Sequence, residues 1–136
     1  MVVCYNKKCI FIHIPKTAGT SVEQFLKDNE KNEINYLGVK NNRSMHHYTA
    51  HELKKIEPYI FDIYYKFSIV RNPYDRLLSE YYWCPIPDVG FKYGKTKVEF
   101  LNYVSKVVKG KRYFENIYNE HFIPQYMFLY NNKLLV

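Results

Sequence analysis

The sequence predicts an α/β fold in which a parallel sheet is flanked by helices on both faces. The prediction rests on two strand–loop–helix segments, residues 10–26 and 64–83. Each segment begins with an apolar run typical of a buried strand and ends with apolar residues at helical spacing. In such folds ligands bind at the carboxyl ends of the strands, which here means after Ile14 and after Val70.

The first segment combines the features of an anion-binding loop. Ile10–Ile14 is the expected strand, Pro15–Ser21 is a turn of Pro, Gly and hydroxyl residues, and Val22, Phe25 and Leu26 give the helical spacing. The start of a helix presents N–H groups and the positive end of the helix dipole, which suits a phosphate or sulfate. Lys16 adds a positive charge, and hydroxyl donors come from Thr17, Thr20 and Ser21.

This loop differs from the phosphate-binding loop of NTPases. That motif has two glycines and a lysine directly before a Ser or Thr, whereas here Lys16 comes three residues before Gly19, the loop's one glycine. The argument for an anion does not depend on that signature. The alternative is an ordinary strand-to-helix turn capped by Thr or Ser.

The region between the two segments predicts small elements. Residues 28–35 are polar and are expected to end the first helix, residues 36–39 favour a short strand, and residues 41–44 favour a loop. A short helix is predicted after Thr49, because Glu52 three residues later completes a capping box.

That short helix is expected to run through Ile56 and to end at Pro58. The second segment then begins with a strong strand at residues 64–70. Pro73 is expected at the first helical turn, where its missing N–H does no harm, and residues 74–83 have helical periodicity.

The last third of the chain is less regular. Residues 84–94 hold two prolines and two glycines and predict a loop of the kind that often covers a site. A helix is predicted over residues 97–108. Asn131 and Asn132 indicate a turn, so residues after 130 are expected to form a hairpin.

Composition favours one globular domain over residues 1–136, since 47% of the residues are hydrophobic. The net charge of +7 fits a polyanionic partner, but the lysines are dispersed, which argues against a specific nucleic-acid site. The cysteines, Cys4, Cys9 and Cys84, fit neither a metal site nor a disulfide framework. No signal peptide or membrane span is visible, so we expect a cytoplasmic protein.

The second segment contains a second pair of residues that could bind an anion. Arg71 follows the strand and Ser79 lies eight residues later in the helix, and a guanidinium with a hydroxyl can hold a phosphate that lies along that helix. The alternative is that Arg71 forms an ordinary ion pair with Asp75 or Glu80.

Together the two segments resemble the sulfotransferases that use 3′-phosphoadenosine 5′-phosphosulfate (PAPS). The resemblance lies in residues 15–21 (PKTAGTS) and 70–81 (VRNPYDRLLSEY), with weaker similarity at residues 47–53 and 121–125. It covers roughly residues 8–136 and is strongest to the carbohydrate (family 2 type) branch. It implies a P-loop-NTPase-like parallel sheet flanked by helices, short at the C-terminus compared with relatives.

The resemblance also implies an activity and its substrates. A sulfuryl group would pass in line from PAPS to an acceptor hydroxyl, on a saccharide for the closest branch, leaving 3′,5′-ADP and needing no metal. The first motif would hold the 5′-phosphosulfate through Lys16, Thr17, Ala18, Gly19, Thr20 and Ser21. Arg71 and Ser79 would hold the 3′-phosphate.

Two roles remain for catalysis. Lys16 is placed to neutralise the oxygen that leaves, and the acceptor hydroxyl needs a base, for which a histidine suits. His47 matches the histidine position of the family, with His46 next and His13, Glu23 and Glu52 in reserve. Alternatively, His47 only packs beside the following helix.

Two other functions stay open from the sequence. The chain could bind 3′,5′-ADP, PAPS or a sulfated glycan without catalysis, or it could be a nucleotide-binding phosphotransferase. The acceptor, the oligomeric state and the source organism cannot be read from these residues.

Overall fold

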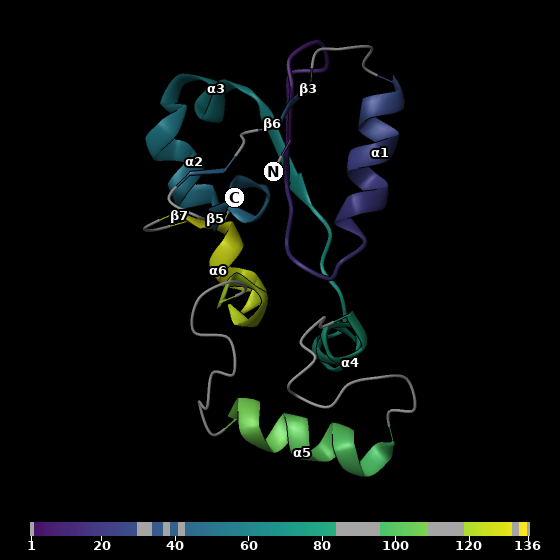
Figure 1. The fold of residues 1–136 in the computed structure, drawn as a ribbon. Coiled ribbons are helices and arrows are strands. Elements are labelled where there is room, and N and C mark those ends of the chain that lie inside the picture. Colours follow the sequence, from purple (N-terminus) through teal and green to yellow (C-terminus); the bar gives the residue numbers. More distant parts are fainter. Residues whose placement is uncertain are drawn as a thin grey trace. The chain divides into compact units, whose positions relative to one another are not determined.

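The computed structural model describes residues 2–29, 34–36, 39–40, 43–83, 96–108, 119–131 and 134–135. The chain divides into two compact units (Figure 1). Unit 1 comprises residues 1–70 and 120–136, and unit 2 comprises residues 71–119. The prediction of one domain over the whole chain stays a prediction.

The centre of unit 1 is a four-stranded sheet in the order β3-β1-β2-β6. Its strands are β1 (Val2–Cys4), β2 (Cys9–Ile12), β3 (Ile34–Tyr36) and β6 (Tyr65–Ser68). The two predicted strands, β2 and β6, are parallel neighbours, with Cys9 opposite Tyr65 and Ile12 opposite Ser68. However, β1 runs antiparallel to both β2 and β3. The sheet is therefore mixed, and the prediction of a parallel sheet was wrong for β1 and β3.

The antiparallel half follows from a tight turn near the N-terminus. Residues 5–8 connect β1 to β2, and the N–H of Lys8 donates to the carbonyl of Tyr5 at 3.2 Å. Lys8 has a left-handed φ of 47°, as turn residues often do. Four residues can join only antiparallel strands, because a parallel crossover needs a dozen or so.

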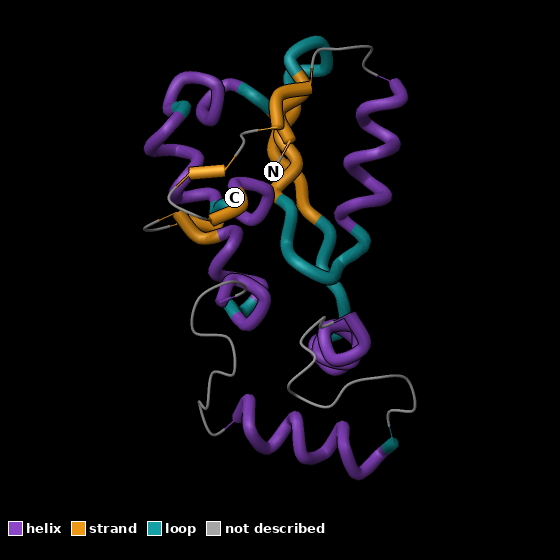
Figure 2. The backbone as a smooth tube through the Cα atoms, viewed as in Figure 1, coloured by secondary structure: helices purple, strands orange, loops and turns teal. Residues whose placement is uncertain are grey.

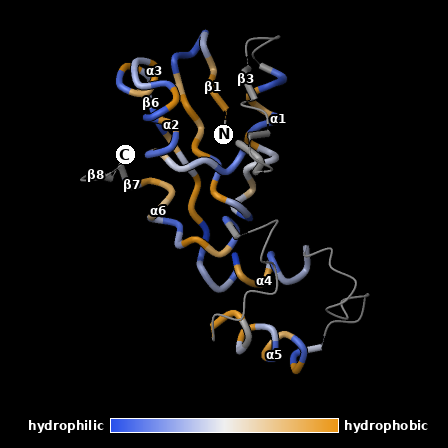
Figure 3. The backbone as a smooth tube through the Cα atoms, turned by 60° about the vertical axis from the view of Figure 1, so that its left-hand side comes forward, coloured by the Kyte–Doolittle hydropathy of each residue, from blue (hydrophilic) through white to orange (hydrophobic). Residues whose placement is uncertain are grey.

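Both faces of this sheet are covered by helices, as predicted (Figures 1 and 2). Alternate side chains of β1 and β2 enter two separate cores. One core packs the strands against α2 (Ala50–Ile56), α3 (Pro58–Ile63) and α6 (Gln125–Leu129). The other packs them against α1 (Gly19–Asn29). Consequently β2 is buried on both faces, and β1 and β2 are among the most hydrophobic stretches of the chain (Figure 3).

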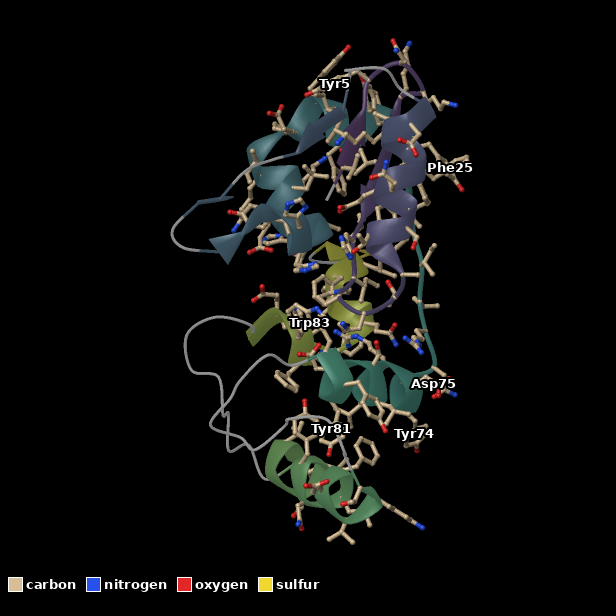
Figure 4. All side chains as sticks on the ribbon, turned by 45° about the vertical axis from the view of Figure 1, so that its right-hand side comes forward. Tyr5, Phe25, Tyr74, Asp75, Tyr81 and Trp83 are labelled. Atoms are coloured by element: carbon tan, nitrogen blue, oxygen red, sulfur yellow. The ribbon has the colours of Figure 1, made fainter. Side chains whose placement is uncertain are left out.

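Helix α1 buries only part of the apolar face that its sequence suggests. Leu26 packs on the sheet with Val22, but Phe25 is 65% exposed and points away from the sheet (Figure 4). Glu23 is buried instead, at 8% exposure. The helix thus turns a carboxylate toward the interior, which the spacing of apolar residues could not predict.

Helix α2 begins with the predicted capping box. The Glu52 N–H donates to the Thr49 hydroxyl oxygen, and the Glu52 carboxylate accepts from the Thr49 N–H at 2.8 Å. The helix ends at Ile56, just before Pro58, as expected. Pro58 also begins α3, which was not predicted, and occupies the first turn where proline is tolerated.

The small elements of unit 1 agree in part with expectation. The short strand predicted at residues 36–39 is divided between β3 and β4 (Val39–Lys40), and residues 37–38 lie outside the described residues. Residues 43–44 form β5 (Arg43–Ser44), antiparallel to β4, where a loop was predicted. The C-terminal hairpin is confirmed by β7 (Tyr130–Asn131) and β8 (Leu134–Leu135). The 3₁₀ helices are η1 (Met45–His47) and η3 (Asn119–Phe122).

Unit 2 contains the other two predicted helices, α4 (Pro73–Trp83) and α5 (Lys97–Val108). The side-chain oxygen of Asn72 caps α4 by accepting from the Tyr74 N–H at 2.9 Å. Tyr81 points from α4 toward α5 (Figure 4), where its ring contacts those of Phe100 and Tyr103. The loop predicted at residues 84–94 lies outside the described residues. Within the described part of the chain, no helix is long and apolar enough to cross a membrane.

Candidate functional site

The loop between β2 and α1 has an unusual backbone conformation. Lys16 and Ala18 both have left-handed φ values, 66° and 65°, and Thr17 between them does not. Such conformations are uncommon and cost energy for residues other than glycine. Alternation of this kind turns neighbouring N–H groups toward a common point and forms an anion-binding concavity. Strain at these positions therefore favours a binding role for the loop.

The first turn of α1 continues that surface. The helix begins with bonds from the Ser21 and Val22 N–H groups to the Ala18 carbonyl, at 3.0 and 3.3 Å. The N–H groups that precede them lie at the positive end of the helix. The Thr20 and Ser21 side chains are exposed at this end, and Lys16 is half-buried.

Thr17 differs from the other hydroxyl residues of the loop. Its side chain is buried at 2% exposure, and its hydroxyl donates to the Ile14 carbonyl at 2.8 Å. The hydroxyl proton of Thr17 therefore braces the loop against the end of the strand. Any contribution of Thr17 to an anion would come from its backbone N–H.

His13 links the end of β2 to α1. Its Nδ1 lies 2.7 Å from the Glu23 Oε1, and both side chains are buried. Burial alone would raise the pKa of Glu23, but the hydrogen bond and charge of His13, together with His46, outweigh it and hold the pKa below its ordinary value. The Glu23 carboxylate is therefore ionised at neutral pH and accepts the Nδ1 proton of His13.

His47 packs against His13 from η1. The rings meet edge to face with centroids 4.6 Å apart, and the His47 Nδ1 lies 3.2 Å from the His13 carbonyl oxygen. Because a carbonyl can only accept, Nδ1 carries the proton and Nε2 is the basic nitrogen of His47. Burial first, and then the neighbouring His13, lower the pKa of His47 to about 3. His47 is therefore neutral over the physiological range.

Two further histidines border this group. The Nδ1 of His46 lies 3.6 Å from the Glu23 Oε1. His121 reaches the group from η3, with its ring 5.3 Å from that of His47. Four of the chain's five histidines thus form one group, in which His13 and His46 lie next to Glu23, His47 contacts His13, and His121 contacts His47. Among the described residues, no group of three or more His, Cys, Asp or Glu could hold a metal ion.

Glu52, the third reserve candidate, lies in the first turn of α2. Its carboxylate accepts from both the N–H and the hydroxyl of Thr49, at 2.8 and 2.9 Å, in the cap of α2. This engagement gives Glu52 a structural role and separates it from the other reserve candidates, His13 and Glu23.

The second motif lies in unit 2. Arg71 is exposed and precedes the Asn72 cap of α4, and Ser79 is half-buried two turns into the helix. The structure also shows a residue that the sequence reasoning missed. Arg76 is buried, and burial lowers its pKa while the adjacent Glu80 opposes that shift. The four-residue spacing of Arg76 and Glu80 was the available signal.

We predict that Gly19→Ala destabilises the protein through His13. A Cβ at residue 19 would lie 1.9 Å from the His13 Nε2, so the ring or the helix start must move. Overpacking of this kind costs about 1–3 kcal/mol. Urea unfolding measures the cost, with Lys27→Ala, at an exposed position in the last turn of α1, as the control. The cost should shrink in a His13→Ala background, and equal costs in the two backgrounds would contradict the contact.

A second prediction concerns acid stability. Between pH 6.5 and about 3 the unfolded chain protonates His47 and the folded chain does not, so the unfolded state binds more protons. The free energy of unfolding should therefore fall as the pH drops through this window, by up to about 1.4 kcal/mol per pH unit from this group. Urea unfolding at pH 6.5 and 5 measures it.

For that measurement, the His47→Gln variant should show a shallower pH dependence than the wild type. His51→Gln is the matched control, because it removes a histidine on α2. Equal pH slopes for His47→Gln and the wild type would show that His47 takes up its proton in the folded chain as readily as in the unfolded one.

Comparison with known proteins agrees with these features. The model of the sulfotransferase family matches residues 1–134 of the chain's 136. A search of curated proteins and a search of solved structures each found no match. The match spans almost the whole chain and confirms the resemblance drawn from the two motifs. The chain therefore belongs to the sulfotransferase family, of the family 2 type.

Proposed function

We propose that this protein transfers a sulfuryl group from PAPS to an acceptor hydroxyl, with a saccharide as the acceptor class. The observation that carries the proposal is the loop after β2, where left-handed Lys16 and Ala18 turn the backbone toward an anion. That loop coincides with the first motif of a chain that the sulfotransferase family model matches over residues 1–134.

The residues of the loop suit the phosphosulfate end of the donor. Backbone N–H groups at residues 16–21 and the start of α1 supply donors and a positive dipole. Thr20 and Ser21 add exposed hydroxyls, and Thr17 contributes its backbone because its hydroxyl is bonded to Ile14. In unit 2, Arg71 and Ser79 are our candidates for the 3′-phosphate, on the strength of the second motif.

The chemistry that PAPS supplies is an activated sulfuryl group, so the protein has to position the reactants and stabilise charge. Lys16 would neutralise the oxygen that gains negative charge as the bond to sulfur breaks. Its half-buried position in the loop is compatible with that role. No metal enters this proposal.

His47 is our candidate for the base, with His46 next. The tautomer of His47 leaves Nε2 able to accept the proton of an acceptor hydroxyl. A pKa of about 3 makes it a weak base by itself. Negative charge held on the neighbouring loop would favour the imidazolium and raise that pKa toward neutrality. His13 is a poorer candidate, because its ring is held between Glu23 and Gly19.

The first test is calorimetric titration of the chain with 3′,5′-ADP, using 5′-AMP and ATP as controls. We expect 3′,5′-ADP to bind most tightly, because only it carries both phosphates that the two motifs are proposed to hold. Arg71→Ala should weaken 3′,5′-ADP at least tenfold, since a charge-assisted pair is lost, and leave 5′-AMP almost unchanged. Lys97→Ala, exposed in the same unit, is the control.

Other outcomes of that titration would favour other functions. Preference for ATP would support a nucleotide-binding phosphotransferase. Binding of 3′,5′-ADP without turnover of PAPS on any acceptor would support a non-catalytic binding protein. Absence of binding in a folded chain would contradict the proposal.

Turnover is tested with sulfur-labelled PAPS and a panel of desulfated polysaccharides. Lys16→Ala should lower the rate by about 10²–10³-fold, the usual cost of removing one group that stabilises developing charge. Lys27→Ala, an exposed lysine in the last turn of α1, is the matched control and should turn over normally. A Lys16→Ala rate within threefold of the wild type would remove Lys16 from the mechanism.

A further inference from the structure

We propose that Glu23 and His13 form a positioning pair for His47, holding it in the tautomer and orientation that a base requires. The pair touches neither reactant in this scheme and acts through the His13 backbone. The inference rests on the proposed function for its catalytic consequence, but its structural part can be tested without turnover.

The pair itself is strongly constrained. Glu23 and His13 are 8% and 7% exposed, and their hydrogen bond measures 2.7 Å. The Nδ1 of His46 also lies close to Glu23, 3.6 Å from its Oε1. The bond to Glu23 thus fixes which nitrogen of His13 carries a proton and where that nitrogen points.

The remaining sides of the His13 ring are also occupied. Its Nε2 lies against Gly19 so closely that a Cβ there would be 1.9 Å away. Its face stacks on Phe11, with ring centroids 5.7 Å apart and planes 25° apart. The glycine therefore admits the ring at the start of α1, and the carboxylate one turn later holds it there.

The fixed ring also fixes a backbone group. The carbonyl oxygen of His13 accepts from the His47 Nδ1 at 3.2 Å, while the two rings meet at 75°. Because ring and carbonyl belong to one residue, the bond to Glu23 limits how that carbonyl can turn. Loss of the bond would free His13 to shift, and His47 would lose the acceptor that selects its tautomer.

Stability alone is a weak reason to keep such a pair in a core. Replacement of a buried ion pair by apolar side chains of similar volume is often neutral or stabilising. A carboxylate that orients a histidine, which in turn orients the reacting group, is a recurrent arrangement in active sites. The position of the pair directly beside the loop at residues 15–21 fits that use.

The structural part is tested by two-bond ¹H–¹⁵N spectra of the histidine rings at pH 7, with no cofactor added. His47→Gln identifies the signals of His47. In the wild type we expect a neutral His47 protonated at Nδ1. Glu23→Leu removes the carboxylate that accepts from His13. In this variant we expect His47 to be a mixture of the Nδ1-protonated and Nε2-protonated forms. Glu23→Gln retains an acceptor oxygen and should restore most of the Nδ1-protonated form.

The catalytic part is tested on the same variants. Glu23→Leu should lower kcat by about 10–100-fold, the usual effect of removing a group that orients a histidine, while the Kd for 3′,5′-ADP stays within threefold. Glu23→Gln should lie between Glu23→Leu and the wild type. Glu99→Leu is the matched control, because Glu99 caps α5 through Thr96 and its loss should change neither the spectrum nor kcat.

The outcomes separate this inference from the proposed function. A wild-type His47 protonated at Nε2, or a Glu23→Leu variant with wild-type spectrum and kcat, would overturn the inference alone. If Glu23→Leu does not fold, two results can still overturn the inference. One is a wild-type His47 protonated at Nε2, and the other is a kcat of Glu23→Gln equal to that of the wild type. Failure of the wild type to bind 3′,5′-ADP would overturn the proposed function and leave the tautomer result standing.

Discussion

The candidate site of unit 1 depends on the burial of β2 on both of its faces. Its four residues pack into two cores, one against α1 and one against α2, α3 and α6, and its edges pair with β1 and β6. A strand enclosed in this way cannot slip by one residue without exchanging its two sets of side chains. His13 and the loop at residues 15–21 follow it directly, so the register of β2 determines where they lie.

Electrostatics connect the two halves of this site. A carboxylate with a lowered pKa stands among histidines, next to a loop whose backbone can receive an anion. Glu23 would repel an anion if it faced the loop unscreened. Its hydrogen bond to His13 and its nearness to His46 offset that charge within the protein. The cluster can therefore keep an ionised carboxylate beside the loop that we propose as the anion site, and dispersed lysines elsewhere leave the chain at +7.

Local sequence patterns predicted the elements whose signals are local. Helix α5 has the predicted bounds, α4 begins at Pro73, and the Thr49–Glu52 capping box has its expected bonds. Strand β1 was missed, because its three residues are too few to show a periodicity and one of its two partners, β3, is distant in sequence. The left-handed φ of Lys16 and Ala18 was missed as well, because composition normally indicates such positions by glycine.

The pairing of His13 with Glu23 shows where prediction from the sequence stops. Both residues were reserve candidates for the base, and neither their types nor their spacing indicated that they would form a hydrogen bond with each other. The pairing requires α1 to turn Glu23 rather than Phe25 inward, and it requires Gly19 to admit the ring. Helical spacing of apolar residues predicts Phe25 on the buried face beside Val22 and Leu26, and only Phe25 departs from that prediction. The carboxylate of Glu23 can take the interior position because His13 forms a hydrogen bond with it there. Without His13, burial of this charge would cost free energy that this hydrogen bond no longer offsets. Val22 and Leu26 still pack on the sheet, so the rotation of α1 satisfies these apolar contacts and the Glu23–His13 bond together.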